Sequence, residues 1–377
     1  MCASPCPSCC PKIEIVPSPL TRNRPPRHIA WFLTAHGFGH GVRASALLHS
    51  LPQDTEVTLY TALPEAFFRE ELNRSFRVVH CELDCGCVQP DSVTVDISAT
   101  LARYAEIESR RESMIPDLAD RLRDENVDLV IGDIPPLAFP LARHAKLPSW
   151  AICNFSWADI YAPYVRTRPS FQPLLERIRA DYALATKHLR LFPHFGDALC
   201  PEPEELGVVC REGISQREEL AQRIGLNPAK KWCLIYLGNF GLEGVNWERL
   251  SDFPDWEFFG LYPLSSSVPN YHRVNKDPSL RYADLTASAD LVLGKLGYSL
   301  VAECLAHGTP ILFPGRSDFA EFHMLKRLVE ERKLGREIPL DDLKALRLDP
   351  YLNPAASLRR EKMEAEGRER FLEFLGF

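Results

Sequence analysis

A short loop near the start of the chain carries two histidines and three glycines, a combination suited to proton transfer beside a bound ligand. His36 and His40 alternate with Gly37, Gly39 and Gly41, directly after an apolar run. Glycines let the backbone turn sharply and approach a ligand closely, and a neutral imidazole can accept a proton near pH 7. The spacing differs from the dinucleotide fingerprint G-x-G-x-x-G, so we do not expect a Rossmann dehydrogenase. A tight turn whose histidines only cap backbone groups is the alternative interpretation.

Asp133 is a candidate partner for one of these histidines. It closes the apolar run 127–133 and precedes Pro135 and Pro136. The carboxyl ends of parallel strands meet at one edge of a sheet, which would bring Asp133 near the histidine loop. A carboxylate bonded to an imidazole raises its basicity, and such a His–Asp dyad could deprotonate an acceptor hydroxyl. Asp133 could instead cap a helix that begins near Pro135.

A segment in the second half of the chain has the pattern of a phosphate-binding turn. An apolar run is followed by Lys295 and Gly297, Ser299 opens a helical stretch, and Glu303 follows four residues later. The free backbone amides of Gly297, Tyr298 and Ser299 at a helix N-terminus would bind a diphosphate, with Lys295 as a further cation. Glu303 would lie on the same helical face as Ser299 and could accept hydrogen bonds from both ribose hydroxyls. A plain strand–helix unit with a surface glutamate is the alternative.

The elements that must position these residues alternate in type along the chain. Short apolar runs predict strands at 28–34, 56–60, 76–80, 127–131, 149–153, 232–237, 256–261, 291–294 and 310–313. Longer amphipathic stretches predict helices at 42–50, 97–125, 137–144, 299–306, 321–331 and 355–377. Such alternation is typical of α/β proteins with parallel sheets covered by helices. Because the pattern is interrupted between 193 and 213, we expect two Rossmann-like domains facing each other across a cleft.

Composition excludes several classes of protein. Of the 377 residues, 45% are hydrophobic and 25% are charged, as in a globular chain rather than a disordered or fibrous one. The net charge of -7 offers no general attraction for nucleic acid. No apolar run is long enough for a membrane span and no signal-peptide pattern opens the chain, so we expect a cytoplasmic protein.

Cysteine is the one compositional excess, with 12 in the chain and four in the first ten residues. Cys6 and Cys9 form a CxxC, but no second CxxC or histidine pair follows at zinc-finger spacing. We therefore expect reduced thiols and no metal site.

The second half of the chain resembles the donor-binding half of GT-B glycosyltransferases. The resemblance rests on the turn 294–299, on Glu303 and on the following segment 313–328. It implies that the turn holds a nucleotide diphosphate and that Glu303 holds the ribose. By the same resemblance His40 is the expected base, His36 the alternative base and Asp133 the orienting partner.

Further residues join the expected donor site through their place in that fold. Asn239 follows the first strand of the second half and would approach the phosphates from the opposite side. Arg316 and Glu321 lie where GT-B enzymes contact the donor sugar, although the acidic residue followed by Gln that is common there is absent. The expected donor-binding residues are Gly39, Asn239, Lys295, Gly297, Tyr298, Ser299, Glu303, Arg316 and Glu321.

A closer resemblance, over residues 28 to about 353, is to the glycosyltransferase-like N-terminal region of plant L-arabinokinases. It is carried by Leu83-Asp84-Cys85-Gly86 with Val88, Gln89 and Asp91, by Asn154-Phe155-Ser156-Trp157, and by Gly294-Lys295 with Gly297-Tyr298. Loop positions among these would line an acceptor pocket through Asp84, Gln89, Asn154 and Trp157, although the core is the commoner place for a tryptophan. The chain has no kinase phosphate loop, so we do not expect arabinokinase activity.

The fold that the resemblance implies divides the chain into five segments. We expect a flexible Cys/Pro-rich tail at 1–26, an N-terminal acceptor domain at 27–200 and a linker at 201–214. A C-terminal nucleotide-sugar domain would span 215–353, and a helix at 354–377 would return to the N-terminal domain.

Together these features predict a metal-independent glycosyltransferase. We expect it to move a hexosyl or pentosyl group from a nucleotide-diphosphate sugar, with UDP as the expected nucleotide, to an acceptor hydroxyl or other nucleophile. The acceptor could be a small molecule, a glycan or a protein, and we expect inversion with a histidine base and no cofactor. The alternatives are a nucleotide-sugar epimerase or hydrolase of the same fold, and a non-catalytic nucleotide-sugar sensor.

Overall fold

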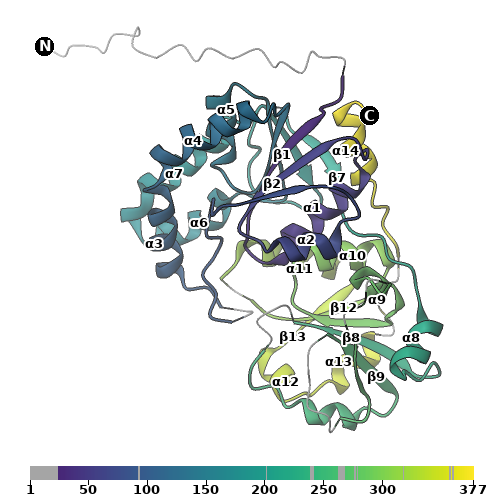
Figure 1. Ribbon diagram of the computed structural model, residues 1–377. Coiled ribbons are helices and arrows are strands. Elements are labelled where there is room, and N and C mark those ends of the chain that lie inside the picture. The colour runs from purple at the N-terminus through teal and green to yellow at the C-terminus, as the bar shows by residue number, and fades with distance from the viewer. Residues whose placement is uncertain are drawn as a thin grey trace, which may run out of the picture.

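The computed structural model describes residues 24–91, 94–200, 202–237, 242–261, 268–275, 277, 279–316, 318–355, 358 and 361–377. These residues form two α/β domains, each built on one parallel sheet covered by helices, which confirms the expected fold class (Figure 1). No helix in these ranges is long and apolar enough to cross a membrane.

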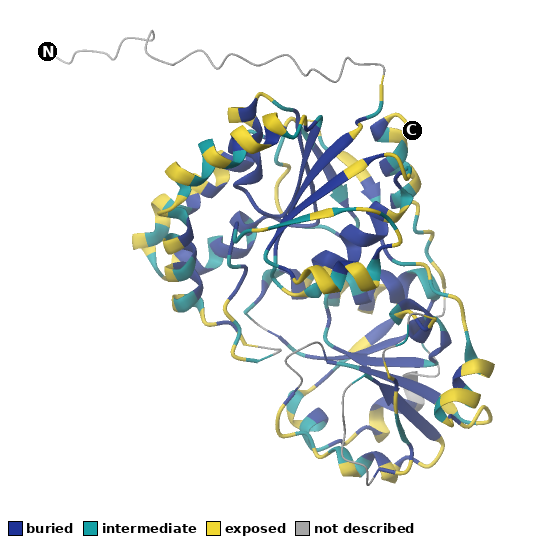
Figure 2. Ribbon diagram, viewed as in Figure 1, coloured by how far each residue is buried: buried dark blue, intermediate teal, exposed yellow. Residues whose placement is uncertain are grey.

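The N-terminal sheet has seven strands: β1 (His28–Leu33), β2 (Glu56–Thr61), β3 (Arg77–His80), β4 (Leu129–Asp133), β5 (Ser149–Cys153), β6 (Lys187–Leu191) and β7 (Glu204–Gly207). Their order is β3-β2-β1-β4-β5-β6-β7. Every pairing is parallel, and Leu33 at the end of β1 lies opposite Asp133 at the end of β4. Because β1, β4 and β5 are buried along their whole length, their sequences are almost continuously apolar (Figure 2).

The helices of this domain are α1 (Phe38–Ser50), α2 (Glu65–Glu71), α3 (Ile97–Glu108), α4 (Arg111–Asp124), α5 (Ala138–Ala145), α6 (Trp157–Arg166) and α7 (Gln172–Tyr182), with a 3-10 turn at Pro169–Phe171. The single helix expected over 97–125 is therefore wrong, because the chain breaks between α3 and α4. There the Ser109 hydroxyl donates to the Glu106 carbonyl at 2.7 Å. Local side-chain bonds of this kind compete with continuation of a helix.

The C-terminal sheet has six parallel strands: β8 (Lys231–Tyr236), β9 (Trp256–Gly260), β10 (Tyr271–Arg273), β11 (Leu291–Gly294), β12 (Ile311–Pro314) and β13 (Gly335–Ile338), in the order β10-β9-β8-β11-β12-β13. Its helices are α8 (Arg217–Ile224), α9 (Tyr282–Ser288), α10 (Tyr298–His307), α11 (Ala320–Glu331), α12 (Leu340–Lys344) and α13 (Asp349–Ala355), with a 3-10 helix at Trp247–Asp252. The two edge strands, β10 and β13, have the sequences YHR and GREI, which lack an apolar run, and sequence analysis missed both.

The last helix, α14 (Gly367–Leu375), returns to the N-terminal domain as expected (Figure 1). The Phe371 ring meets Trp31 edge-on, 5.8 Å between ring centres, and the Gly367 amide donates to Val208 at 3.0 Å. The helix is shorter than the expected 355–377, since 361–366 is not helical. The segment expected as a linker, 201–214, contains β7, whose Leu206 is fully buried.

Helix α10 joins the two domains. It follows strand β11 of the C-terminal sheet, but its residues Tyr298 and Ala302 pack into the core of the N-terminal domain. The first turn of α10 therefore lies against the first turn of α1. This contact brings together the two loops from which chemistry was expected.

Candidate functional site

The main candidate site is a cavity of about 260 Å³ between the two sheets. Loops that follow β1, β11 and β12 line it, and the carboxyl ends of strands are where ligands bind in open α/β sheets. Its lining residues are Ala35, His36, Gly37, Phe38, Gly39, His40, Arg43, Cys85, Cys87, Gln89, Tyr236, Lys295, Leu296, Gly297, Tyr298, Ser299, Leu300, Arg316, Phe319 and Glu321. Both expected histidines and most of the expected donor residues thus share one cavity.

His36 is held as a hydrogen-bond donor toward the cavity. Its Nδ1 lies 3.0 Å from the Cys87 amide, which can only donate. The ring proton must therefore sit on Nε2. Desolvation, followed by the charges of His40 and Lys295, holds the pKa of His36 well below its usual range. Gly86 makes this contact possible, because it has φ +58° and any Cβ there would lie 2.4 Å from the His36 ring.

His40 is a neutral imidazole with a free Nδ1. Burial, followed by the charge of Arg43, lowers the pKa of His40 to about 4, although Asp133 opposes the shift. Its Nδ1 lies 3.6 Å from Asp133 Oδ1, beyond hydrogen-bond length, and has no partner among the described residues. The ring is therefore uncharged at neutral pH and able to accept a proton.

Asp133 is paired with Arg43 rather than with a histidine. The Arg43 Nε lies 3.2 and 3.1 Å from the two Asp133 oxygens, and Nη2 adds a further bond. Burial alone would raise the pKa of Asp133, but Arg43 lowers it below its usual value. The expected His40–Asp133 pair is thus adjacent but not bonded, and the carboxylate mainly balances a buried guanidinium.

A series of hydrogen bonds connects the Arg43–Asp133 pair to the C-terminal domain. Arg43 Nη1 donates to Asn154 Oδ1 at 2.5 Å, and the Asn154 amide donates to Glu321 Oε1 at 2.7 Å. Asn154, an expected acceptor-binding residue, therefore acts as a bridge behind the cavity wall. Burial raises the pKa of Glu321, although the bond from Asn154 opposes the shift.

The first turn of α10 presents free amides to the cavity. Gly297 is the cap residue, no side chain caps the helix, and a Cβ at Gly297 would meet nothing within 4 Å. The Ser299 hydroxyl donates to the Gly39 carbonyl at 2.7 Å across the domain boundary. The Tyr298 hydroxyl instead points into the N-terminal domain, where it donates to Phe192 at 3.1 Å. The backbone, more than the side chains, is therefore available to bind an anion here.

Lys295 and Arg316 give the cavity a positive wall. Burial, followed by the Arg316 charge, lowers the pKa of Lys295 to about 8. Arg316 is 8% exposed and stacks on Phe319, 4.3 Å from its guanidinium carbon to the ring centre. Its Nε and Nη2 atoms are buried and have no hydrogen-bond partner within the described part of the chain. Buried donors without acceptors are unfavourable, so this wall suits an anionic ligand.

Glu303 does not lie where the sequence predicted. It is 1% exposed and does not line the cavity. Arg211, from the segment that links the domains, donates to Glu303 at 2.8 Å and also to Glu71 at 3.0 Å. Thr286 contacts the second Glu303 oxygen at 3.4 Å. The helical phase that brings Tyr298 and Ala302 into the N-terminal core turns Glu303 toward the linker instead of a ribose.

The remaining acceptor candidates are divided. Gln89 lines the cavity, and its Nε2 is buried without a partner among the described residues. Asp84 and Trp157 lie behind the cavity, where Thr34 and the indole of Trp157 donate to Asp84 at 2.7 Å each. Burial raises the pKa of Asp84 to about 6, although these bonds oppose the shift. Both residues support His36, whose ring meets Trp157 edge-on at 5.3 Å.

Two further predictions concern residues that lie wholly or partly outside the described ranges. Asn239 and the tail 1–23 lie outside the described residues. Among the residues that are described, no three His, Cys, Asp or Glu side chains form a group that could hold a metal.

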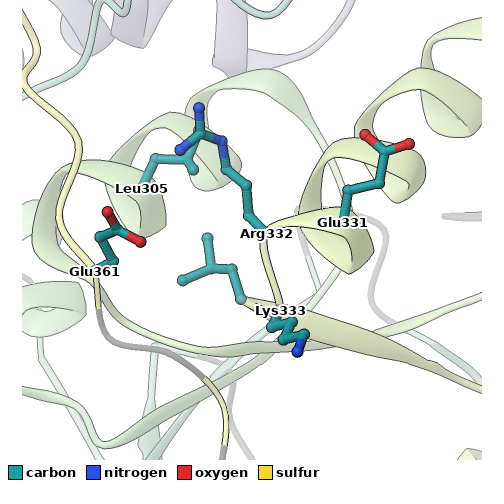
Figure 3. A pocket seen from close by; sticks show the side chains of 6 residues that line it. Leu305, Glu331, Arg332, Lys333 and Glu361 are labelled. Carbon is teal, nitrogen blue, oxygen red and sulfur yellow. The ribbon is translucent and has the colours of Figure 1, made fainter.

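A second cavity, of about 350 Å³, lies where the ends of α10 and α11 meet the segment before α14 (Figure 3). Its walls are Leu305, Glu331, Arg332, Lys333, Leu334 and Glu361. Residues 331–333 are exposed, charges of both signs are present, and no buried unpartnered polar atom of the described chain lies in it. It therefore lacks the features of a ligand site that the first cavity has.

Arg43 is the site residue that sequence reasoning missed. It follows the glycine–histidine loop and is 1% exposed. An arginine between Val42 and Ala44, within the stretch 42–48 that is apolar apart from Arg43 and Ser45, was the available signal, because a buried guanidinium requires a carboxylate partner.

Known proteins resemble this chain in sequence and in fold. No protein-family model matches the sequence. The chain is 29% identical over 343 residues to L-arabinokinase of Arabidopsis thaliana; the match covers 88% of this chain and 32% of that protein, so the chain spans about a third of its relative's length.

Solved structures match over nearly the whole chain. A UDP-glucosyltransferase from Polygonum tinctorium has a TM-score of 0.61 at 13% identity, covering 94% of both chains. The glycotransferase of kitacinnamycin has a TM-score of 0.58 at 19% identity, covering 94% and 96%. A protein assigned as a UDP-N-acetylglucosamine 2-epimerase from Listeria monocytogenes has a TM-score of 0.56 at 11% identity, covering 92% and 94%. The chain thus has the GT-B fold of glycosyltransferases and is related in sequence to one segment of L-arabinokinase.

Proposed function

We propose that this protein is a glycosyltransferase that uses a nucleotide-diphosphate sugar. The observation that carries the proposal is the single cavity in which a neutral His40 from one domain faces a cationic helix N-terminus from the other. The first group suits proton removal from an acceptor, and the second suits a leaving diphosphate.

The diphosphate would lie at the first turn of α10. Its charge would be balanced by the amides of Gly297, Tyr298 and Ser299 and by the Lys295 ammonium, which makes no ion pair with any described residue. UDP is the proposed nucleotide, since one structural neighbour is a UDP-glucosyltransferase. Glu303 has no part in this proposal, because Arg211 already occupies its carboxylate.

The transfer would be a single displacement. The acceptor oxygen bonds to the anomeric carbon, the bond from that carbon to the phosphate oxygen breaks, and His40 Nε2 takes the acceptor proton. His36, with its proton on Nε2, would donate a hydrogen bond to the departing phosphate oxygen. The two histidines would thus have opposite roles: His36 Nδ1 accepts from the Cys87 amide, whereas His40 would carry its ring proton on Nδ1, 3.6 Å from Asp133, and leave Nε2 free as the base.

An enzyme that rearranges or hydrolyses the nucleotide sugar itself is the second candidate. The structural match to the Listeria protein assigned as a UDP-sugar 2-epimerase favours it. Product analysis without an acceptor separates the two, because a new nucleotide sugar would form only in an epimerase.

A nucleotide screen tests the donor site. We expect one of UDP, GDP, dTDP or ADP to raise the melting temperature of the protein without added metal, and calorimetry to give its Kd. Gly297→Ala should weaken that affinity about tenfold or more, since the added methyl group would project into open space at the helix N-terminus. The melting temperature of unliganded Gly297→Ala is the control, because nothing within 4 Å would be displaced. If no nucleotide binds, the proposed function is wrong. Tight binding with no turnover for any donor and acceptor would instead indicate a sensor.

Lys295 should make nucleotide binding weaken at alkaline pH. Its pKa of about 8 in the free protein means that the ammonium is charged at pH 7 and loses its charge as pH rises through 8. The affinity for the nucleotide diphosphate should therefore fall between pH 7 and 9. Lys295→Arg should bind with little change over the same range, because a guanidinium stays protonated. Equal pH profiles for the two proteins would contradict the assignment.

A further inference from the structure

Arg316 carries hydrogen-bonding capacity that the proposed diphosphate site does not use. Its side chain is 5% exposed, and both Nε and Nη2 lack a partner among the described residues. A buried guanidinium without acceptors is strongly unfavourable unless an anion arrives. Arg316 lines the cavity between the two sheets, where a ligand could contact it.

Asp318 is the nearest carboxylate, and it does not satisfy Arg316. Arg316 Nε lies 3.7 Å from Asp318 Oδ1, beyond hydrogen-bond length, and that oxygen is itself buried without a partner. The other oxygen, Oδ2, accepts from the Val95 amide of the N-terminal domain at 2.6 Å. Asp318 is therefore held in place by the Val95 amide. Its distance from Arg316 leaves the guanidinium nitrogens available for hydrogen bonds to a ligand.

Arg316 comes from a different strand end than the α10 turn, although its charge is near enough to lower the pKa of Lys295. Lys295 follows β11 and Arg316 follows β12, and the two strands are parallel neighbours in the sheet. Adjacent strands lie about 4.8 Å apart. On the cavity wall, Gln89 Nε2 is a further buried donor without a described partner. The cavity thus offers unpartnered donors and the positive charges of Lys295 and Arg316, beside the one carboxylate of Glu321 among its lining residues.

We propose that this wall binds a carboxylate on the substrate, with Arg316 as the residue that selects it. A carboxylate offers two acceptor oxygens and a negative charge to the unpartnered Arg316 nitrogens, whereas a sugar hydroxyl offers one uncharged oxygen that also donates. The proposal rests on the proposed function, which places a diphosphate at α10. The carboxylate belongs either to an acidic sugar on the donor or to an acidic acceptor.

The test compares ligands that differ only in this group. Calorimetry with UDP, UDP-glucose and UDP-glucuronate measures whether the wild-type protein binds the acidic sugar at least about tenfold more tightly than the neutral one. If it does not, free glucuronate is titrated into the UDP complex to test the acceptor as the source. Arg316→Gln should abolish whichever preference is found and leave the Kd for UDP within about threefold. Asp318→Asn should strengthen the preference a few-fold, because it removes the competing carboxylate.

The outcomes separate this proposal from the proposed function. Binding of UDP with no preference for either carboxylate ligand overturns the proposal alone. An equal loss of UDP and UDP-glucuronate affinity in Arg316→Gln assigns Arg316 to the diphosphate and also overturns it. A preference that Arg316→Gln leaves unchanged, with only a lower melting temperature, identifies Arg316 as a structural partner of Asp318. Absence of any nucleotide binding instead overturns the function on which the proposal rests.

Discussion

Replacing Arg43 by Met is expected to lower the free energy of unfolding by about 3–5 kcal/mol at pH 7. Arg43 and Asp133 are 1% and 0% exposed, and the guanidinium bonds to both carboxylate oxygens. Methionine fills much of the same volume but leaves the Asp133 charge buried and uncompensated. Urea denaturation of the two proteins measures the difference. Arg69→Met is the matched control, because the Arg69 side chain is 71% exposed and its loss should change stability by less than about 0.5 kcal/mol.

The pH dependence of this loss has a definite sign. In the wild type, Arg43 outweighs burial and holds the pKa of Asp133 below its unfolded value, so the stabilisation is present above that value and lost as pH falls. Without Arg43, burial would raise the pKa of Asp133, and the folded state would lose stability as pH rises. The free energy of unfolding that Arg43→Met loses relative to the wild type should therefore be smaller at pH 4.5 than at pH 7. The double variant Arg43→Met/Asp133→Asn should show little of this dependence. A deficit that is equal at both pH values would show that lost packing, rather than the buried charge, is responsible.

The sequence predicted the parts of the fold in which one signal dominates. Strands such as β1 and β4 are buried on both faces, so their composition alone marks them, and a parallel α/β fold follows from their alternation with helices. Sequence patterns do not predict the elements whose position or length is set by tertiary contacts. β7 is a four-residue edge strand in what reads as a linker, and its position depends on pairing with β6. The break between α3 and α4 falls at Ser109 and Arg110, in a stretch whose sequence pattern is helical throughout.

The same distinction holds for the candidate site. Spacing along the chain correctly placed His36, His40 and the α10 turn on one cavity, because loops at the carboxyl ends of parallel strands converge. Spacing could not reveal which partner each side chain has. Glu303 lies four residues after Ser299, as a ribose ligand would, yet an arginine 92 residues away in the chain occupies it. Such pairings depend on how the two domains pack, and no local pattern encodes them.

The different roles of the two histidines also depend on tertiary contacts. In the sequence they are equivalent candidates within one loop. In the structure, the backbone amide of Cys87 fixes the proton of His36 on Nε2, whereas His40 has no bonded partner on Nδ1. The amide belongs to a loop 51 residues away in the chain, held by the positive φ of Gly86. This contact, together with Asp133 on the Nδ1 side of His40, distinguishes the proposed hydrogen-bond donor from the proposed base.

Turnover should fall about 100-fold or more in His40→Ala, with the Kd for the nucleotide changed by no more than a few-fold. His40 would take the acceptor proton only as the new bond forms, whereas the nucleotide binds mainly to the α10 turn. Release of the nucleotide diphosphate from a sugar donor that carries the nucleotide identified by the binding screen, with acceptor or with water in its place, measures the loss. His49→Ala is the matched control, because His49 lies on the same helix, is exposed and does not line the cavity.

The pH profile of kcat/KM tests the assignment of His40 as the base more strictly than the loss of turnover does. A histidine with its usual pKa would give a fall in kcat/KM near pH 6.5. The buried His40, with a pKa of about 4 in the free protein, should keep kcat/KM level from pH 7 down to about 5 and lose it only below that. The profile should be measured as kcat/KM for the donor, because this quantity reports the enzyme without bound donor, to which the pKa of about 4 applies. Unchanged turnover in His40→Ala would remove His40 from the mechanism. A larger loss in His36→Ala, together with an acid limb near pH 6.5, would assign the proton transfer to another group and reverse the roles inferred from the Nδ1 contacts.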